Sequence, residues 1–235
     1  MKIYRSILLA CAAGALLCSC DTYVTPGNEG NLGATSSIKV KAAFTGKPAI
    51  TFPAHIALVR IEGAGSVDRA GVATYGVVTS REIETEEDFK TISKCPGIAG
   101  VVSMNNLLLS DAAATQEDVR AAAAKLHANA ILIYTVNSES HNNDAIPPLT
   151  VVTLGLAPNT TYQISSSASA ILMDTKTGFV YGALEQKATR NGLTTSWGSS
   201  DTIDAARRGN ERATFEKLVA SFDPFWKDVY ARYNR

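Results

Sequence analysis

The sequence has no excess charge of either sign and few aromatic residues. Lys and Arg together number 22, Asp and Glu together number 22, and aromatic residues make up 7%. A neutral chain lacks the basic surface that attracts nucleic acids, so we expect no nucleic-acid partner. Apolar residues at 46% and charged residues at 19% are globular values, which exclude a disordered chain, a polytopic membrane protein and a collagen-like fibre.

Cysteine is also scarce, and three of the four cysteines lie within the first twenty residues. With Cys95 as the single thiol beyond residue 20, the rest of the chain has no framework of intramolecular disulfides, so its stability must come from a packed core. Cys95 is followed by Pro96 and Gly97, which suggests the last turn of a helix, where the helix dipole disfavours a thiolate. We therefore expect Cys95 to be a half-buried structural residue rather than a nucleophile.

Patterns typical of metal or catalytic sites are missing. The three histidines, His55, His127 and His141, fall on a predicted strand, a helix end and a loop, with no Cys or acidic partner at ligand spacing. The glycines at 63 and 65 lack the third glycine and the following helix of a dinucleotide site. No Gly-x-Ser-x-Gly elbow occurs. The sequence predicts no metal, no cofactor and no catalytic residue.

The first twenty residues have the organisation of an export signal. Lys2 and Arg5 precede an uninterrupted apolar run from Ile7 to Leu17. Eleven residues span about 16 Å as a helix, roughly half the thickness of the hydrocarbon core, so this run is too short for a permanent membrane span.

The end of this signal, Leu17-Cys18-Ser19-Cys20, resembles the bacterial lipobox. The resemblance implies that Cys20 becomes the first mature residue, carrying diacylglycerol on its thiol and an acyl chain such as palmitate on its amine. It implies a lipoprotein on the bacterial cell membrane, inner or outer, with its domain in the periplasm. Two or three acyl chains hold a protein stably, whereas one is marginal. The alternative is an ordinary secretory signal cleaved elsewhere.

The composition divides the remaining chain into a tether and one domain. Residues 21–37 are rich in Gly, Asn, Ser and Thr, which predicts a flexible tether, and residues 38–235 are expected to form a single α/β domain. We expect an α/β (α+β) fold with a mixed sheet, strand–helix alternation, a late pair of β-hairpin strands and C-terminal helices packed on the sheet. The expected strands are at residues 54–61, 75–83, 100–109, 129–136, 149–156, 161–173 and 179–186.

Three helices are expected between and after these strands. Thr85 and Thr115 each stand three residues before an Asp, the spacing of an N-terminal capping box, and the acidic residues from Glu84 to Asp88 suit a solvated helix start. A third helical region spans 200–233, with a restart at Asp223-Pro224. Its stripe of Trp226, Val229, Tyr230 and Tyr233 predicts core or docking surface.

Two segments of the chain resemble a group of bacterial envelope domains. Ala122 to Ile133 resembles their "A…A…L.AD" helix with the strand that follows it, and Leu172 to Val180 resembles their strand and hairpin with Asp, Thr and Gly. The group comprises the curli-secretion lipoprotein CsgG, the amino-terminal domain of TolB and the penicillin-binding-protein activator LpoB, and the similarity covers residues 50–190. CsgG forms a pore with two amphipathic hairpins, and Leu149–Ser169 can be interpreted as one such hairpin.

These observations lead to three hypotheses of different classes. The first is a lipid-anchored, non-catalytic periplasmic lipoprotein that binds an envelope protein or assists assembly, through a sheet edge or the aromatic C-terminal helix. The second is an oligomeric secretion or pore subunit. The third is an envelope hydrolase, which requires a cleft where a histidine meets Ser, Asp or Glu. The partner, the oligomeric state and any small-molecule ligand stay open.

Overall fold

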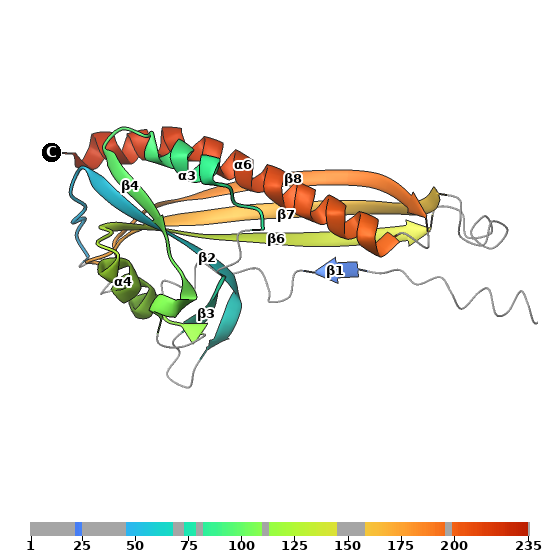
Figure 1. Ribbon diagram of the computed structural model, residues 1–235, viewed down its shortest axis with the longest axis horizontal. Helices are drawn as coiled ribbons and strands as arrows, with labels where there is room; N and C mark the ends of the chain where they lie inside the picture. The colour runs from blue at the N-terminus through green and yellow to red at the C-terminus, as the bar shows by residue number, and fades with distance from the viewer. Residues whose placement is uncertain are drawn as a thin grey trace, which may run out of the picture. The chain divides into compact units, whose positions relative to one another are not determined.

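A mixed sheet with helices packed on it organises the computed structural model (Figure 1). The structure describes residues 22–24, 46–67, 73–78, 82–109, 113–144, 158–195 and 199–234. The strands are β1 (Thr22–Val24), β2 (Ala54–Val67), β3 (Ala73–Val78), β4 (Ile98–Ser103), β5 (Ala113–Ala114), β6 (Ala130–Asp144), β7 (Pro158–Asp174) and β8 (Val180–Thr195). The helices are α3 (Glu86–Ser93), α4 (Gln116–Lys125) and α6 (Ser199–Tyr233), with a 3₁₀ turn at Asn106–Leu108.

The sheet has the order β5-β3-β2-β6-β7-β8, with β4 paired to β2 and β1 paired to β6. β2 runs parallel to β4 and to β6, with Ile56 opposite Val101 in one and opposite Ala130 in the other. β2 runs antiparallel to β3. The predicted α/β fold with a mixed sheet is therefore confirmed.

The chain divides into two compact units, which are described separately. Unit 1 contains residues 1–24, 138–166 and 189–210, and unit 2 contains residues 25–137, 167–188 and 211–235. Both predicted boundaries near residues 20 and 37 lie outside the described residues.

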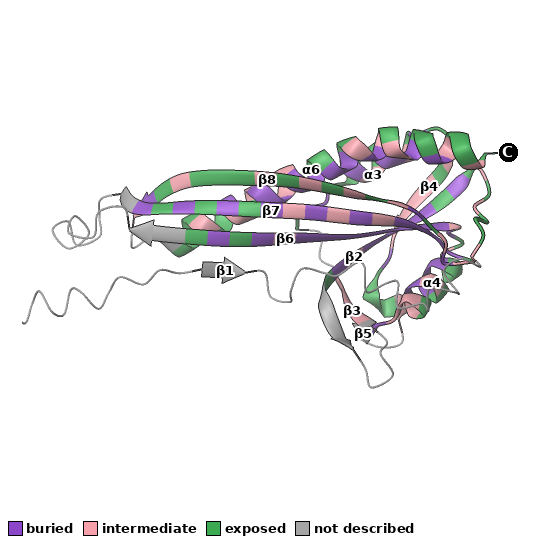
Figure 2. Ribbon diagram, turned by 180° about the vertical axis from the view of Figure 1, so that it is seen from behind, coloured by how far each residue is buried: buried purple, intermediate pink, exposed green. Residues whose placement is uncertain are grey.

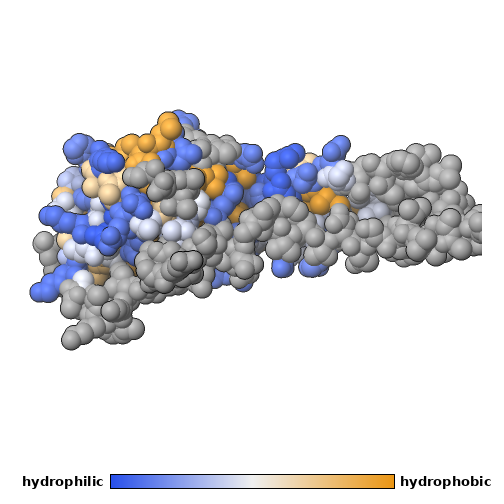
Figure 3. Space-filling model, turned by 90° about the horizontal axis from the view of Figure 1, so that it is seen from below, coloured by the Kyte–Doolittle hydropathy of each residue, from blue (hydrophilic) through white to orange (hydrophobic). Residues whose placement is uncertain are grey.

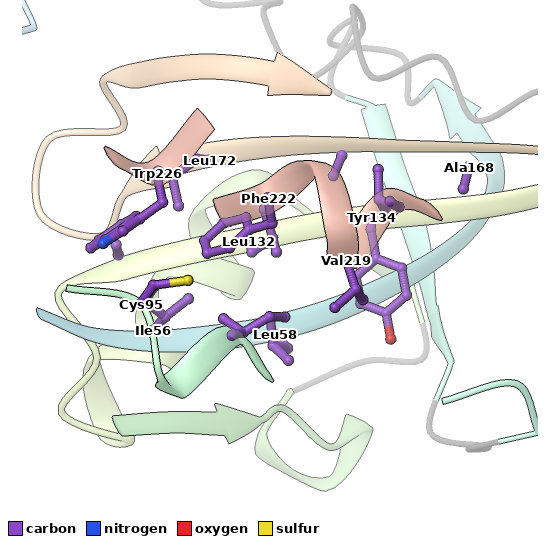
Figure 4. Close-up of a cluster of buried hydrophobic side chains, with 14 of the residues drawn as sticks. Ile56, Leu58, Cys95, Leu132, Tyr134, Ala168, Leu172, Val219, Phe222 and Trp226 are labelled. Atoms are coloured by element: carbon purple, nitrogen blue, oxygen red, sulfur yellow. The ribbon is translucent and has the colours of Figure 1, made fainter. Parts of the chain in front are cut away.

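Unit 2 has apolar side chains on both faces of its sheet. Ile56 and Leu58 of β2 belong to one buried cluster with Phe222 and Trp226 of α6 and Leu132 of β6 (Figure 4). The residues that alternate with them, such as Ala57 and Val59, belong to a second cluster with Val119 and Ala122 of α4. Because side chains of a strand alternate between faces, the near-continuous apolar runs of β2 and β6 are those of strands buried on both sides.

The starts of α3 and α4 have the local structure that the sequence predicts. Thr85 and Thr115 lie in extended conformation, and each forms a reciprocal capping box with the Asp three residues later. At the end of α4, His127 adopts the left-handed conformation with φ 55°, where Gly is usual. The sequence did not predict this conformation of His127.

The turn between β7 and β8 also follows the prediction. The amide of Asp174 donates to the carbonyl of Phe179, and the amide of Gly178 donates to the carbonyl of Asp174. Gly178 has φ 71°, which a side-chain-free residue adopts without strain. The late β-hairpin is confirmed.

Unit 1 contains the end of β6, the first part of β7, the last part of β8 and the first part of α6. Tyr162, Ile164 and Ala206 form a small buried cluster with Ile203 packed against it. The hydroxyl groups of Ser138 and Ser166 are 2.8 Å apart, and the side-chain amide of Asn210 donates to Ser166 Oγ at 2.8 Å. A helix thus covers one face of these strands through both apolar and polar contacts.

Several predicted strand boundaries are wrong. β6 continues to Asp144 through a segment that was predicted as a polar loop, and β2 continues to Val67 through Gly63 and Gly65, with irregular register after Glu62. β3 ends at Val78 rather than at 83, and β4 ends at Ser103 rather than at 109. Pro158 is the first residue of β7, although this strand was predicted to begin at residue 161. Proline has no amide hydrogen to donate, and it is tolerated at the first position of a strand.

Further differences concern the tether, one strand and the last helix. Thr22–Val24, within the predicted tether, pairs with β6, and the predicted strand at 149–156 lies outside the described residues. α6 is one helix with Pro224 inside it rather than two. Proline removes a hydrogen bond to the carbonyl four residues earlier, and that residue, Ala220, is exposed, where water can replace the donor. Among the described residues, no helix is long and apolar enough to cross a membrane.

Candidate functional site

The exposed face of the sheet in unit 1 brings together side chains from three long strands. On β7, Ile164 and Ser166 face α6 through their contacts with Ala206 and Asn210. Because strand side chains alternate, Gln163 and Ser165 point to the opposite face. Both are exposed, and the alternation of exposed and buried residues continues along β7 (Figure 2).

Cross-strand contacts place residues of β6 and β8 on the same face. Ser165 Oγ lies 3.4 Å from Thr189 Oγ1 of β8, while a Cβ at Gly192 would meet the ring of Tyr162 on the covered face. On β6, Ser138 contacts Ser166 on the covered side, so the residues next in the alternation point outward. We define the open sheet face by its exposed members: Glu139, His141, Thr161, Gln163, Ser165, Thr189, Asn191 and Leu193.

The open sheet face is polar without a dominant charge. Five of its eight side chains are hydroxyls or amides, which donate and accept hydrogen bonds, and Leu193 is 62% exposed. A face of this composition can form many adaptable hydrogen bonds to another polar surface. The view from below in Figure 3, which is not a view onto this face, shows hydrophilic side chains together with separate hydrophobic patches on the coloured surface.

The three histidines lie on three different segments of the chain. His55 of β2 and His127 after α4 are exposed in unit 2, and His141 lies on the open sheet face of unit 1 rather than in a loop. No group of three His, Cys, Asp or Glu side chains within the described ranges is placed to hold a metal ion.

Cys95 lies in the core of unit 2 and is more deeply buried than the sequence predicts. It is 6% exposed, and its thiol donates to Asp223 Oδ1 at 3.6 Å. Burial, followed by the nearby negative charge of Asp223, raises the pKa of Cys95 to about 11. A thiol in this state is a poor nucleophile.

Cys95 should therefore resist alkylation in the folded protein. We expect iodoacetamide at pH 8 to modify it at least ~100-fold more slowly than in urea, since less than about one thiol in 10² is ionised and the group is buried. Peptide mass spectrometry after timed quenching measures this rate. Equal rates with and without urea would contradict the placement.

The acidic run from Glu84 to Asp88 is not uniformly solvated, which corrects the prediction. Glu86 and Glu87 are exposed, but Glu84 and Asp88 are each 6% exposed. Glu84 Oε1 accepts from Tyr134 Oη at 2.9 Å and lies 3.3 Å from Arg60 Nη1. The sequence does contain a signal for this pairing that was missed: Arg60 is a cation within the apolar run of β2 and needs an acidic partner there.

Asp88 is paired with Arg212 of α6. Arg212 Nη2 donates to Asp88 Oδ1 at 3.0 Å, and Arg212 Nη1 donates to the carbonyl of Ile83 at 2.7 Å. Burial by itself raises the pKa of Asp88, but hydrogen bonds from Arg212 and Thr85 outweigh it and hold the pKa below its ordinary value. The pair fastens the start of α3 to α6.

Replacing Arg212 with glutamine should lower the free energy of unfolding by about 2 kcal/mol at pH 7, since Asp88 then stays buried without its cation. The pKa of Asp88 is lower in the folded state, so this stabilisation is present above the unfolded pKa near 3.8 and is lost as the pH falls through the folded pKa. The difference between wild type and variant should therefore shrink below pH 4 in urea titrations. Arg232→Gln, which breaks an exposed pair with Asp228, is the control and should change stability by less than ~0.5 kcal/mol.

Asp174, in the turn between β7 and β8, is fully buried and its carboxylate accepts four hydrogen bonds. Oδ1 accepts from the amides of Lys176 and Thr177, and Oδ2 accepts from the amide of Ala49 and from Tyr181 Oη. Burial and the hydrogen bond to Asp174 raise the pKa of Tyr181. This carboxylate has a structural role, because it holds the turn through Lys176, Thr177 and Tyr181 and also binds the distant segment at Ala49.

The aromatic stripe of the C-terminal helix lies mainly in the core. Trp226 is 0% exposed and donates from Nε1 to the carbonyl of Pro96 at 2.7 Å, while Tyr230 and Tyr233 are half-buried against Phe52, Phe179 and Tyr181. The stripe was predicted to be either core or docking surface, and Trp226 belongs to the core. A small apolar hollow of about 10 Å³, lined by Leu58, Leu132 and Phe222 among others, has room for no more than about one water molecule.

Comparisons with known proteins give little further information. A scan against models of protein families found no match, and neither did a comparison with curated protein sequences. A search of solved structures found the PelC dodecamer from Paraburkholderia phytofirmans, with 11% sequence identity and a TM-score of 0.28 over 85% of this chain and 98% of that chain. A TM-score this low does not establish a shared fold, and the resemblance to the CsgG, TolB and LpoB group stays a prediction.

Proposed function

We propose that this chain is a lipid-anchored, non-catalytic envelope lipoprotein that binds a partner protein through the open sheet face of unit 1. The observation that carries the binding role is the gathering of eight exposed, mainly hydroxyl and amide side chains from β6, β7 and β8 on one face. The anchoring role rests on the lipobox-like Leu17 to Cys20 at the end of an export signal.

Membrane anchoring suits a binding surface of this size and chemistry. Stable interfaces use about 20 to 30 residues on each side, so these eight side chains alone support a weak or transient contact. Attaching both partners to one membrane makes their encounter effectively intramolecular, which compensates for a weak contact. A weak polar interface is therefore sufficient for binding when both proteins are attached to the same membrane.

The pore hypothesis receives less support from the strands that it requires. A strand that crosses lipid turns its apolar face to the lipid, whereas β7, the described strand of the hairpin predicted at residues 149–169, has Tyr162 and Ile164 buried in a cluster with Ala206 of α6. The side chains that β7 leaves exposed, such as Gln163 and Ser165, are polar. Residues 149–157 of the candidate hairpin lie outside the described residues.

Site-specific photocrosslinking in a bacterial host tests the binding proposal on the full chain. A benzoylphenylalanine placed at Gln163, Ser165 or Asn191 should give the same adduct, because these side chains share the open sheet face. The same probe at Glu117 or Asp228, which are exposed in unit 2, is the matched control and should not give that adduct.

A second substitution makes the test specific. Thr189→Arg places a bulky cation beside Ser165, and it should reduce the adduct formed from Gln163 at least ~10-fold. Equal adducts from the control positions, or no adduct from the open sheet face, would overturn the binding role. Either result would leave the lipid anchor to be judged by its own measurement.

A further inference from the structure

We propose that two copies of this chain associate edge to edge through β8, joining their sheets across a two-fold axis at Gln186. β8 is the last strand in the sheet order, and among the described residues no strand pairs with its outer side. An edge strand of sixteen residues presents alternating main-chain donors and acceptors to any strand that approaches it. This inference concerns the edge of the sheet and is independent of the open sheet face.

The side chains near the middle of β8 alternate regularly. Leu184 packs against the core cluster that contains α6, whereas Glu185 and Lys187 point the other way and are exposed by 58% and 72%. Glu185 Oε1 and Lys187 Nζ form an ion pair at 3.0 Å within the strand. The edge thus carries one anion and one cation, two residues apart, on one face.

This charge pattern is self-complementary in an antiparallel pair. With Gln186 on the axis, Glu185 lies opposite Lys187 of the partner subunit, and Lys187 lies opposite Glu185 of the partner subunit. On the covered face, Leu184 then lies opposite Ala188 of the partner subunit, so apolar groups meet. Opposite charges directly across two strands stabilise their pairing, and like charges destabilise it.

The neighbouring registers lack this complementarity. An axis at Glu185 or at Lys187 places two like charges directly opposite each other, and an axis at Leu184 or Ala188 leaves both charges opposite neutral residues. The charges therefore select one register out of five, while main-chain hydrogen bonds supply the association.

The main chain at this position is accessible to a donor from outside the strands. Lys217 of α6 donates from Nζ to the carbonyl of Lys187 at 3.3 Å, in an exposed contact. The flexible side chain of Lys217 can move away when a second strand arrives, because it is held by a single exposed hydrogen bond.

Disulfide trapping tests the axis at single-residue resolution. Directly opposite residues of antiparallel strands have Cα atoms about 4.5–5.5 Å apart, within the range of a disulfide, so a chain with Gln186→Cys should crosslink to its own copy under mild oxidation. Ala188→Cys is the matched control, because its two copies would lie about 14 Å apart along the strands, four strand residues at about 3.4 Å each, beyond disulfide reach. The wild-type chain, oxidised in parallel, gives the background from the native cysteines.

A mixed sample covers the case in which Gln186→Cys disturbs the strand. Chains with Leu184→Cys and chains with Ala188→Cys should crosslink to each other and not to themselves. In the Gln186→Cys background, Glu185→Lys should reduce the crosslink about tenfold, and adding Lys187→Glu should restore it, because the exchange re-creates both opposite-charge pairs.

Each outcome decides the proposal. Crosslinking of Gln186→Cys above the control, or of the mixed sample, with rescue by the charge exchange supports it. Crosslinking no greater than that of Ala188→Cys in both arrangements, or failure of the exchange to restore it, overturns it.

Discussion

Replacing Cys20 with serine should abolish lipid labelling of the chain completely. The hydroxyl of serine does not form the thioether to diacylglycerol, and without that lipid the signal should stay uncleaved, so the product should be longer by residues 1–19. Growth with labelled palmitate, followed by gel electrophoresis, measures both effects in one experiment.

Cys18→Ser is the matched control for this prediction, since it changes a neighbouring thiol within the same signal. It should keep the label and the shorter product. Label remaining in the Cys20→Ser chain, or lost from the Cys18→Ser chain, would show that the anchor lies elsewhere.

Replacing Asp174 with alanine should have the largest effect on stability, a loss of about 3–5 kcal/mol in the free energy of unfolding. The carboxylate accepts hydrogen bonds from three amides and from Tyr181, and its removal leaves these donors unpaired in the interior. Each unpaired buried donor costs about 1–3 kcal/mol, and partial relaxation of the turn limits the total. Urea unfolding measures the change.

Two further variants separate the bonds of Asp174 from its volume. Asp174→Asn keeps one acceptor oxygen, so it should lose less than the alanine variant, and Tyr181→Phe removes one donor and should cost about 1 kcal/mol. An alanine variant within 1 kcal/mol of wild type would contradict the role assigned to this carboxylate.

Local signals in the sequence were enough to predict the parts of the fold that local interactions determine. The capping boxes at Thr85 and Thr115 and the glycine turn at Gly178 depend on residues within a few positions of each other. The strand predicted at residues 54–61 likewise follows from a local apolar run, whose side chains are buried on both faces of the sheet. These features need no knowledge of distant partners.

The misassigned segments depend on residues far away in the sequence. The end of β6 looks like a loop because it is polar on both faces, yet Ser138 lies against Ser166, 28 residues away. Asp88 looks like a solvated helix start, but its partner Arg212 lies 124 residues away. Pairings at such separations leave no local pattern in a single sequence.

The open sheet face was only half predictable for the same reason. Gln163 and Ser165 alternate in the sequence with Tyr162 and Ile164, so the period of a single strand is enough to place them on a polar face. Glu139 and His141 of β6, and Asn191 of β8, join that face only through strands that extend beyond their predicted ends. Both strands were predicted, but each extends beyond its predicted end, and the extra residues carry these side chains.

Intact mass spectrometry of the chain extracted from bacterial membranes measures whether Cys20 carries the lipid. We expect a polypeptide that begins at Cys20 and is heavier than residues 20–235 by one diacylglyceryl group, with or without a further acyl chain on its amine. An unmodified polypeptide, whether it retains residues 1–19 or begins at another position, would contradict the proposed lipid anchor and the membrane-attached binding role that depends on it.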